Sequence, residues 1–184
     1  MDCYVLTGGR SARMGQSKAD LFLSRLTAVA TPVFDRVVAV ERPDGEMRSL
    51  PTIFESPHDG DGPIFGVARS LADAIERCFI LAVDLPLLST AVLRDLRDRF
   101  EHSSAEMLVP MWDGAPQVLC AGYSTKVLPL VERRIASGRL SLRRLLDDAD
   151  VQLIDERVLR AAFPGEPLMN VNTPADLIAA EKIK

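Results

Sequence analysis

The sequence predicts an α/β fold, a three-layer α/β/α sandwich built on a mostly parallel sheet. Its apolar runs are continuous rather than alternating, which is typical of strands covered on both faces. Segments with apolar residues at helical spacing lie between these runs, as in doubly wound sheets. The length of 184 residues fits a single domain, residues 1–184, and no repeat, low-complexity tract or linker divides it.

The expected strands are short and rich in β-forming residues. They are residues 3–7, 36–40, 78–83, 106–110 and 117–121. The run at 78–83 is the most apolar, and it stops at Asp84. The first run ends at Gly8 and Gly9, as a buried strand that feeds a loop would.

The expected helices lie between and after these strands. They cover residues 64–75, 90–100 and 124–135, and a last helix begins at Thr173 and Pro174. Thr173 is a good N-cap residue, and Pro174 suits the first turn because its missing N–H would have no partner there.

The composition restricts the partners. A formal net charge of −4 provides no general attraction for nucleic acid or anionic lipid, so neither is expected as a partner. No basic leader or membrane-length apolar stretch is present, which favours the cytoplasm. Cys3, Cys78 and Cys120 lie in or beside apolar runs and are expected to be reduced and buried, although a metal site or catalytic thiol stays open.

The strongest functional signal is the loop at residues 6–18, Leu-Thr-Gly-Gly-Arg-Ser-Ala-Arg-Met-Gly-Gln-Ser-Lys. Its glycines allow tight turns that present backbone N–H groups, and its three cations would balance a triphosphate. It lacks the Gly-Lys-Ser/Thr ending of a Walker A loop and is not a GxGxxG loop, which disfavours a plain NAD-binding module. The competing interpretation is a glycine-rich surface turn with solvated arginines. The nucleotide-binding residues expected in this loop are Leu6, Thr7, Gly8, Gly9, Arg10, Ser11 and Lys18.

This loop resembles the LxGGxSxRMGxxK signature of the molybdenum cofactor guanylyltransferases, the MobA family, within the wider nucleotidyltransferases that share a Rossmann-like sheet. The resemblance implies that the loop wraps the NTP phosphates, with Lys18 and Arg13 as catalytic groups that stabilise their charge. Guanylyltransferases read Ala-Gly-Gly at its start and CTP-using relatives read Ala-Ala-Gly. The Thr7-Gly8-Gly9 of this chain therefore implies GTP, with Thr7 in place of the usual Ala.

A second glycine-rich turn, at residues 59–66, opens the helix expected from residue 64. An ordinary helix-start loop would look the same. Similar proteins carry an acidic residue followed by Gly-Pro-Leu-x-Gly here, and this loop contacts the base. The resemblance assigns nucleotide binding to Asp59, Gly62 and Pro63, with Asp61 as a rival for the acidic position. A carboxylate can accept hydrogen bonds from the ring N–H and amine of guanine.

Asp84 lies at the carboxyl end of the most apolar strand, where open α/β sheets bind ligands. A capping role is less favoured, because Ser89 or Thr90 would cap the next helix better. The residue resembles the family's Asp-x-Pro motif, whose Asp holds Mg²⁺. Magnesium needs only one or two carboxylates when phosphate oxygens and waters complete its shell.

The C-terminal half adds candidate acceptor-binding residues. Asn170 and Asn172 belong to an Asn-x-Asn-Thr-Pro-x-Asp-Leu element that matches the family, and in an extended segment they would point to one side. They could bind metal, phosphate or pterin, while a turn and N-cap role for Asn172 is the alternative. Arg139 could hold the acceptor, and a solvated helix face explains it equally well.

The resemblance covers nearly the whole chain in the same order, but the segment after Lys18 lacks the usual Gly turn and is shorter. It implies transfer of GMP from GTP to molybdopterin with release of pyrophosphate and with Mg²⁺ as cofactor. It also implies transient contacts with molybdoenzymes or other cofactor-synthesis proteins. The alternatives are a CTP-dependent molybdopterin cytidylyltransferase, a sugar nucleotidyltransferase, and a nucleotide-binding relative without turnover.

Overall fold

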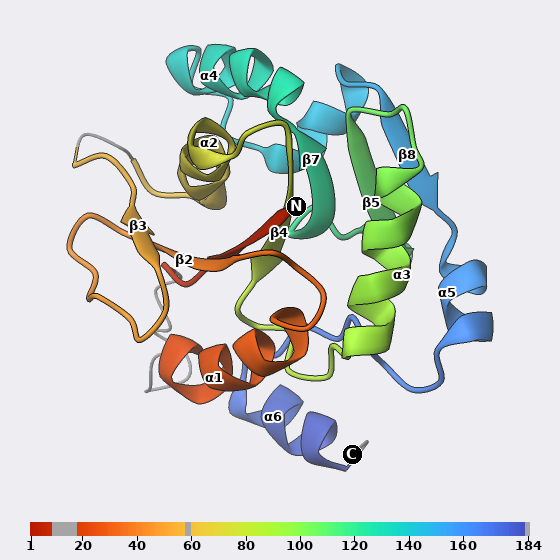
Figure 1. Ribbon diagram of the computed structural model, residues 1–184. Coiled ribbons are helices and arrows are strands. Elements are labelled where there is room, and N and C mark those ends of the chain that lie inside the picture. Colours follow the sequence, from red (N-terminus) through yellow and green to blue (C-terminus); the bar gives the residue numbers. More distant parts are fainter. Residues whose placement is uncertain (9–17, 58–59, 183–184) are drawn as a thin grey trace.

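The structure is a computed structural model that describes residues 1–8, 18–57 and 60–182. Figure 1 shows its strands and helices in chain order. The strands are β1 (Asp2–Leu6), β2 (Val37–Glu41), β3 (Thr52–Phe54), β4 (Arg77–Ala82), β5 (Met107–Trp112), β6 (Ala115–Pro116), β7 (Cys120–Ser124) and β8 (Val151–Ile154). The α-helices are α1 (Lys18–Ala30), α2 (Pro63–Asp73), α3 (Thr90–Glu101), α4 (Leu128–Ala136), α5 (Glu156–Ala162) and α6 (Pro174–Glu181). Short 3₁₀ helices cover Thr125–Val127 and Leu142–Asp147.

The strands form one mixed sheet in the order β3-β2-β1-β4-β7-β5-β6, with β8 paired to β5. β1 pairs in parallel with β2 on one side and with β4 on the other, so the carboxyl ends of these strands meet at one edge of the sheet. β7 runs antiparallel to both β4 and β5. The sheet is therefore mainly parallel, with one reversed strand inside it.

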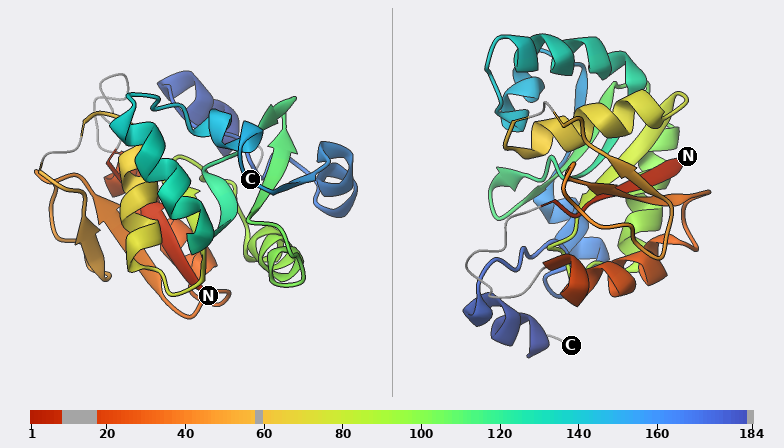
Figure 2. Two further views of the ribbon diagram at one scale, coloured as in Figure 1. Left: turned by 90° about the horizontal axis from the view of Figure 1, so that it is seen from above. Right: turned by 90° about the vertical axis from the view of Figure 1, so that its left-hand side faces the viewer.

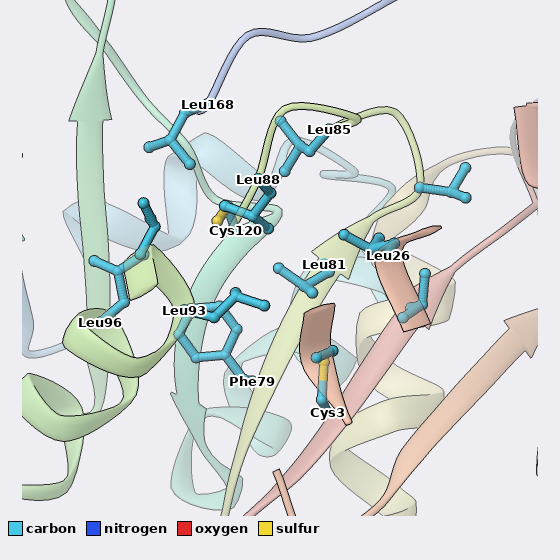
Figure 3. Packing of buried hydrophobic residues seen from close by; sticks show 14 of the residues in the cluster. Cys3, Leu26, Phe79, Leu81, Leu85, Leu88, Leu93, Leu96, Cys120 and Leu168 are labelled. Atoms are coloured by element: carbon cyan, nitrogen blue, oxygen red, sulfur yellow. The ribbon is translucent and has the colours of Figure 1, made fainter. Parts of the chain in front are cut away.

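Helices cover both faces of the sheet, which confirms the predicted three layers. Helices α1 and α3 lie over one face, and α2 and α4 lie over the other (Figures 1 and 2). Successive side chains of β1 alternate between the two cores: Cys3 and Val5 join the cluster under α1 and α3, while Tyr4 joins the cluster under α2 and α4. Figure 3 shows the first of these cores, with Leu26 of α1 and Leu93 and Leu96 of α3 around the strands.

Most of the expected elements are present. The first four predicted strands correspond to β1, β2, β4 and β5, and the helices expected from residues 64 and 90 are α2 and α3. The helix expected over 124–135 is a 3₁₀ turn followed by α4. Thr173 caps α6 as predicted, in a capping box with Asp176, and Pro174 occupies the first turn.

The strand expected at 117–121 lies further along the chain, at Cys120–Ser124. The Cys120 N–H donates to the Gln117 carbonyl, and the Gln117 side chain donates to the carbonyls of Trp112 and Ala115 in the neighbouring hairpin. Gln117 therefore belongs to a turn. The two apolar residues after it, Val118 and Leu119, lie before β7 and do not belong to the strand.

The segment after Lys18 forms α1, a helix of 13 residues that begins at Lys18 itself. Its buried residues Phe22, Leu23 and Leu26 contact the first core. Lys18 therefore lies on the first turn of a packed helix. No helix in the described part of the chain is both long and apolar enough to span a bilayer.

Candidate nucleotide-binding site

A cleft of about 450 Å³ opens at the carboxyl edge of the sheet. Its lining includes the ends of β1 and β4 and the first residues of α1 and α2, represented by Leu6, Lys18, Pro63 and Asp84. Leu6, Ala82, Val83 and Leu119 make part of the lining apolar, whereas Lys18 and Asp84 add opposite charges. The sheet edge therefore brings together several of the residues expected to bind a nucleotide.

Lys18 and Asp84 meet in this cleft. The Nζ of Lys18 lies 3.1 Å from Oδ2 of Asp84, and both side chains are largely buried, at 14% and 19% exposure. The same Nζ donates to Oδ1 of Asn172 at 2.7 Å. Three separate parts of the chain, the start of α1, the end of β4 and the segment before α6, thus converge on one ammonium group.

The segment before α6 is tied to the sheet by backbone hydrogen bonds. The Val171 N–H donates to the Asp84 carbonyl at 2.9 Å, and the Asn172 N–H donates to Oδ2 of Asp176 at 2.9 Å. The pKa of Asp176 is lowered, first by that backbone N–H and then by the side chain of Thr173. Asn172 is therefore presented to Lys18 by a segment that is held at both Asp84 and the start of α6.

Asp84 has one oxygen available for a cation. Its Oδ1 is buried and has no hydrogen-bond partner among the residues that the structure describes, while Oδ2 contacts Lys18. An unpaired buried carboxylate oxygen is costly unless a cation, a donor or water meets it. No cluster of three acidic, histidine or cysteine residues that could hold a metal occurs within residues 1–8, 18–57 and 60–182. These donors fit Mg²⁺ held by one carboxylate and by substrate phosphates.

Thr7, which stands where the family usually has Ala, directly follows β1 and is hydrogen-bonded to the neighbouring strand β2. The residue is 5% exposed, and Oγ1 donates to the Val40 carbonyl at 2.8 Å, beside the Thr7 N–H that donates to the same carbonyl at 3.1 Å. The hydroxyl is therefore satisfied inside the sheet and does not enter the cleft as a new polar group. The next residue, Gly8, lies directly against Arg42, because an added Cβ would sit 2.7 Å from the Arg42 Cγ.

The end of the cleft near β2 carries two charged residues that no sequence motif indicated. Arg42 and Glu55 both line the cleft, together with Asp61 and Gly62 of the second turn. Arg42 Nη1 lies 2.8 Å from Oδ1 of Asp61. The signal for Arg42 was weaker than for Asp84, because Glu41 lies between the apolar run at 36–40 and the arginine. An arginine there was indistinguishable from a solvated one.

The proposed acceptor residues do not gather at one place. Asn172 contacts Lys18, whereas Asn170 donates from Nδ2 to Oε1 of Gln117 at 3.3 Å. Arg139, the third candidate for acceptor binding, lies away from both asparagines, in a surface depression beside α4 that Arg133 and Arg134 also line. Its backbone N–H donates to the Arg134 carbonyl at the end of that helix, which keeps it with α4 rather than with the cleft.

Several expected residues lie outside the described part of the chain. They are Gly9, Arg10, Ser11, Arg13 and Asp59. The three cysteines are all described, and they are free and buried as predicted. Burial raises the pKa of Cys120 to about 12 and raises the pKa of Cys3 and Cys78 as well, which opposes a thiolate role in metal binding or catalysis.

The chain is similar to known nucleotidyltransferases along almost its entire length. The family model described as MobA-like NTP transferase domain matches residues 3–154. A curated protein of Mycobacterium avium named "Probable molybdenum cofactor guanylyltransferase" is 34% identical, over 95% of this chain and 92% of that protein.

Solved structures of nucleotidyltransferases are similar to this chain as well. Molybdopterin-guanine dinucleotide biosynthesis protein A from Archaeoglobus fulgidus superposes with a TM-score of 0.86 at 26% identity, over 100% of this chain and 98% of that one. The 2-C-methyl-D-erythritol 4-phosphate cytidylyltransferase from Thermus thermophilus shares the fold, with a TM-score of 0.68 at 17% identity over 99% and 98% of the two chains. From its motifs, its sheet and these relatives, the chain belongs to the MobA-like NTP transferase family.

Proposed function

We propose that this protein transfers GMP from GTP to molybdopterin and releases pyrophosphate. The observation that carries the proposal is the meeting of Lys18 and Asp84 at 3.1 Å in the cleft at the sheet edge. The names of the similar proteins from M. avium and A. fulgidus support the choice of guanine nucleotide and of molybdopterin. The three free, buried cysteines support a reducing compartment, and we place the reaction in the cytoplasm.

In this proposal different residues of the cleft bind the phosphates and the nucleoside of GTP. Asp84 would hold Mg²⁺ through Oδ1, and the bound ion would offset charge on the phosphate oxygens. Lys18 donates to the same phosphates from the first turn of α1. Leu6, Gly8, Gly62 and Pro63 line the cleft beside it and would contact the nucleoside.

The reaction is an in-line displacement at the α-phosphorus of GTP. A terminal phosphate oxygen of the acceptor forms the new P–O bond, and the bond between the α-phosphorus and the oxygen bridging to the β-phosphate breaks, so that pyrophosphate leaves with that electron pair. The attacking oxygen is already an anion, so no side chain has to remove a proton. The protein contributes positioning and fixed positive charge, which are the usual sources of rate in such transfers.

The proposal is tested by incubating the purified protein with GTP, magnesium chloride and molybdenum-loaded molybdopterin. We expect pyrophosphate and the guanine dinucleotide to appear in equal amounts, and neither to form without the acceptor. Parallel reactions with CTP and ATP should be much slower. Equal or faster transfer from CTP would refute the assignment of GTP, and GTP binding without any pyrophosphate release would indicate a relative without turnover.

A further inference from the structure

Arg42 follows β2 at the same edge of the sheet where Asp84 follows β4. β1 lies between these two strands, and neighbouring strands are about 4.8 Å apart, so the two positions are separated by about 10 Å across the sheet. If the phosphates lie at Lys18 and Asp84, the group that reaches Arg42 is the far end of the nucleotide. That end is the base.

Arg42 is held firmly in the cleft wall. Its stem crosses Gly8 so closely that a Cβ on Gly8 would lie 2.7 Å from Cγ. Its carbonyl accepts from the Gly45 N–H at 2.9 Å in the turn that follows. The preceding residue, Glu41, is 3% exposed and is hydrogen-bonded to Arg48. The side chain of Arg42 is 23% exposed, and it lines the cleft rather than extending into solvent.

Asp61 sets the direction of the guanidinium. The ion pair at 2.8 Å uses one N–H of Nη1, and Nε lies 3.7 Å from Oδ1 of Asp44. The second N–H of Nη1 and the N–H groups of Nη2 then form a planar fork of donors. Asp61 itself is 69% exposed in its side chain, at the mouth of the cleft. Its carboxylate therefore contacts the guanidinium from the solvent side of the cleft.

We infer that Arg42 selects guanine, by donating hydrogen bonds to O6 and N7 of the base while Asp61 holds the guanidinium in position. This inference rests on the proposed function. A planar fork of donors matches the paired acceptors O6 and N7, and this pairing is the commonest specific arginine contact with a base. Adenine carries an amino group where guanine has O6, so the same fork would face another donor. Arg42 thus discriminates by leaving the wrong base with an unpaired polar group.

The test measures binding of GTP, 7-deaza-GTP and ATP, each with magnesium, by calorimetry. 7-Deaza-GTP lacks only the N7 acceptor. We expect the wild-type protein to bind 7-deaza-GTP more weakly than GTP, and Arg42→Met to bind GTP roughly 10- to 100-fold more weakly than wild type. In Arg42→Met the difference between GTP and 7-deaza-GTP should disappear, and ATP affinity should be unchanged. Asp61→Asn should weaken GTP binding by less and also leave ATP affinity unchanged.

Arg94→Met is the matched control, because Arg94 is an exposed arginine on α3, and its GTP affinity should equal that of wild type. Unchanged ATP affinity shows that Arg42→Met still has a folded cleft. An equal loss of GTP and ATP affinity would assign Arg42 to the phosphates or to folding and overturn the inference. A penalty for 7-deaza-GTP that persists in Arg42→Met would also overturn it. Failure of the wild type to bind GTP at all would instead remove the proposed function, and this inference with it.

Discussion

The ammonium of Lys18 lies 3.1 Å from the carboxylate of Asp84, although 66 residues separate them in the chain. Lys18 begins the first helix and Asp84 follows the fourth strand, and only the parallel pairing of β1 with β4 brings the two positions to the same edge of the sheet. Asn172 contacts the same Nζ at 2.7 Å from a segment close to the C-terminus. One of the charged groups of the cleft therefore lies where the sheet and the final segment meet.

Replacing Lys18 with Met should remove the cation and keep most of the side-chain volume. We expect turnover to fall by on the order of 10²–10³, because one fixed charge contact to the reacting phosphates is lost. The circular dichroism spectrum should match that of wild type. Pyrophosphate release with GTP and molybdopterin is the measurement, and full activity in Lys18→Met would remove Lys18 from the catalytic set.

Asp84→Asn should remove the negative charge of the side chain while keeping its size and shape. Asparagine keeps a side-chain oxygen for Lys18 but has no negative charge for a cation, so the magnesium concentration needed for half-maximal activity should rise and turnover should fall by on the order of 10²–10³. Asp95→Asn is the control, since Asp95 pairs with Arg99 on α3 outside the cleft. An unchanged magnesium dependence in Asp84→Asn would show that the cation is held elsewhere.

Asn172 and Asn170 should differ, because their side chains contact different partners. Asn172→Ala removes the hydrogen bond to Lys18, so GTP binding should weaken severalfold even when no acceptor is present. Asn170→Ala removes only the contact with Gln117, and GTP binding should stay at the wild-type level. Calorimetric titration with GTP compares the two variants. If Asn172→Ala raised only the KM for molybdopterin, its contact with Lys18 would have no part in holding the nucleotide.

The sequence was informative wherever a local pattern determines the structure. Continuous apolar runs predicted the central strands, and the position of Asp84 just after one of them predicted its place at the carboxyl edge of the sheet, where it lines the cleft. Thr173 and Pro174 predicted the start of α6 through their own capping chemistry. These features need no knowledge of distant residues.

Other features depend on contacts that no local pattern encodes. An apolar run does not specify strand direction, so the reversed β7 between β4 and β5 was not predicted. Edge strand β8 contains Leu153, which is 53% exposed, and it lacks the continuous buried pattern of the centre. The hydrogen bond of Lys18 to Asn172 joins residues 154 positions apart, and the place of Arg139 beside α4 follows from how its helix ends.

Gly122 lies where β7, the reversed strand, packs against Phe100 of α3. An added Cβ would lie 2.4 Å from Cδ1 and 2.5 Å from Cγ of the Phe100 ring, and Phe100 is fully buried on α3. Gly122→Ala should therefore lower the free energy of unfolding by about 1–3 kcal/mol through overpacking. Urea denaturation of Gly122→Ala, Phe100→Leu and the double variant measures the effect. Because leucine removes the ring that meets the new methyl group, the double variant should be more stable than the sum of the two single changes predicts. Strict additivity would mean that the ring does not oppose a side chain at position 122, and that the close approach of α3 to β7 has another cause.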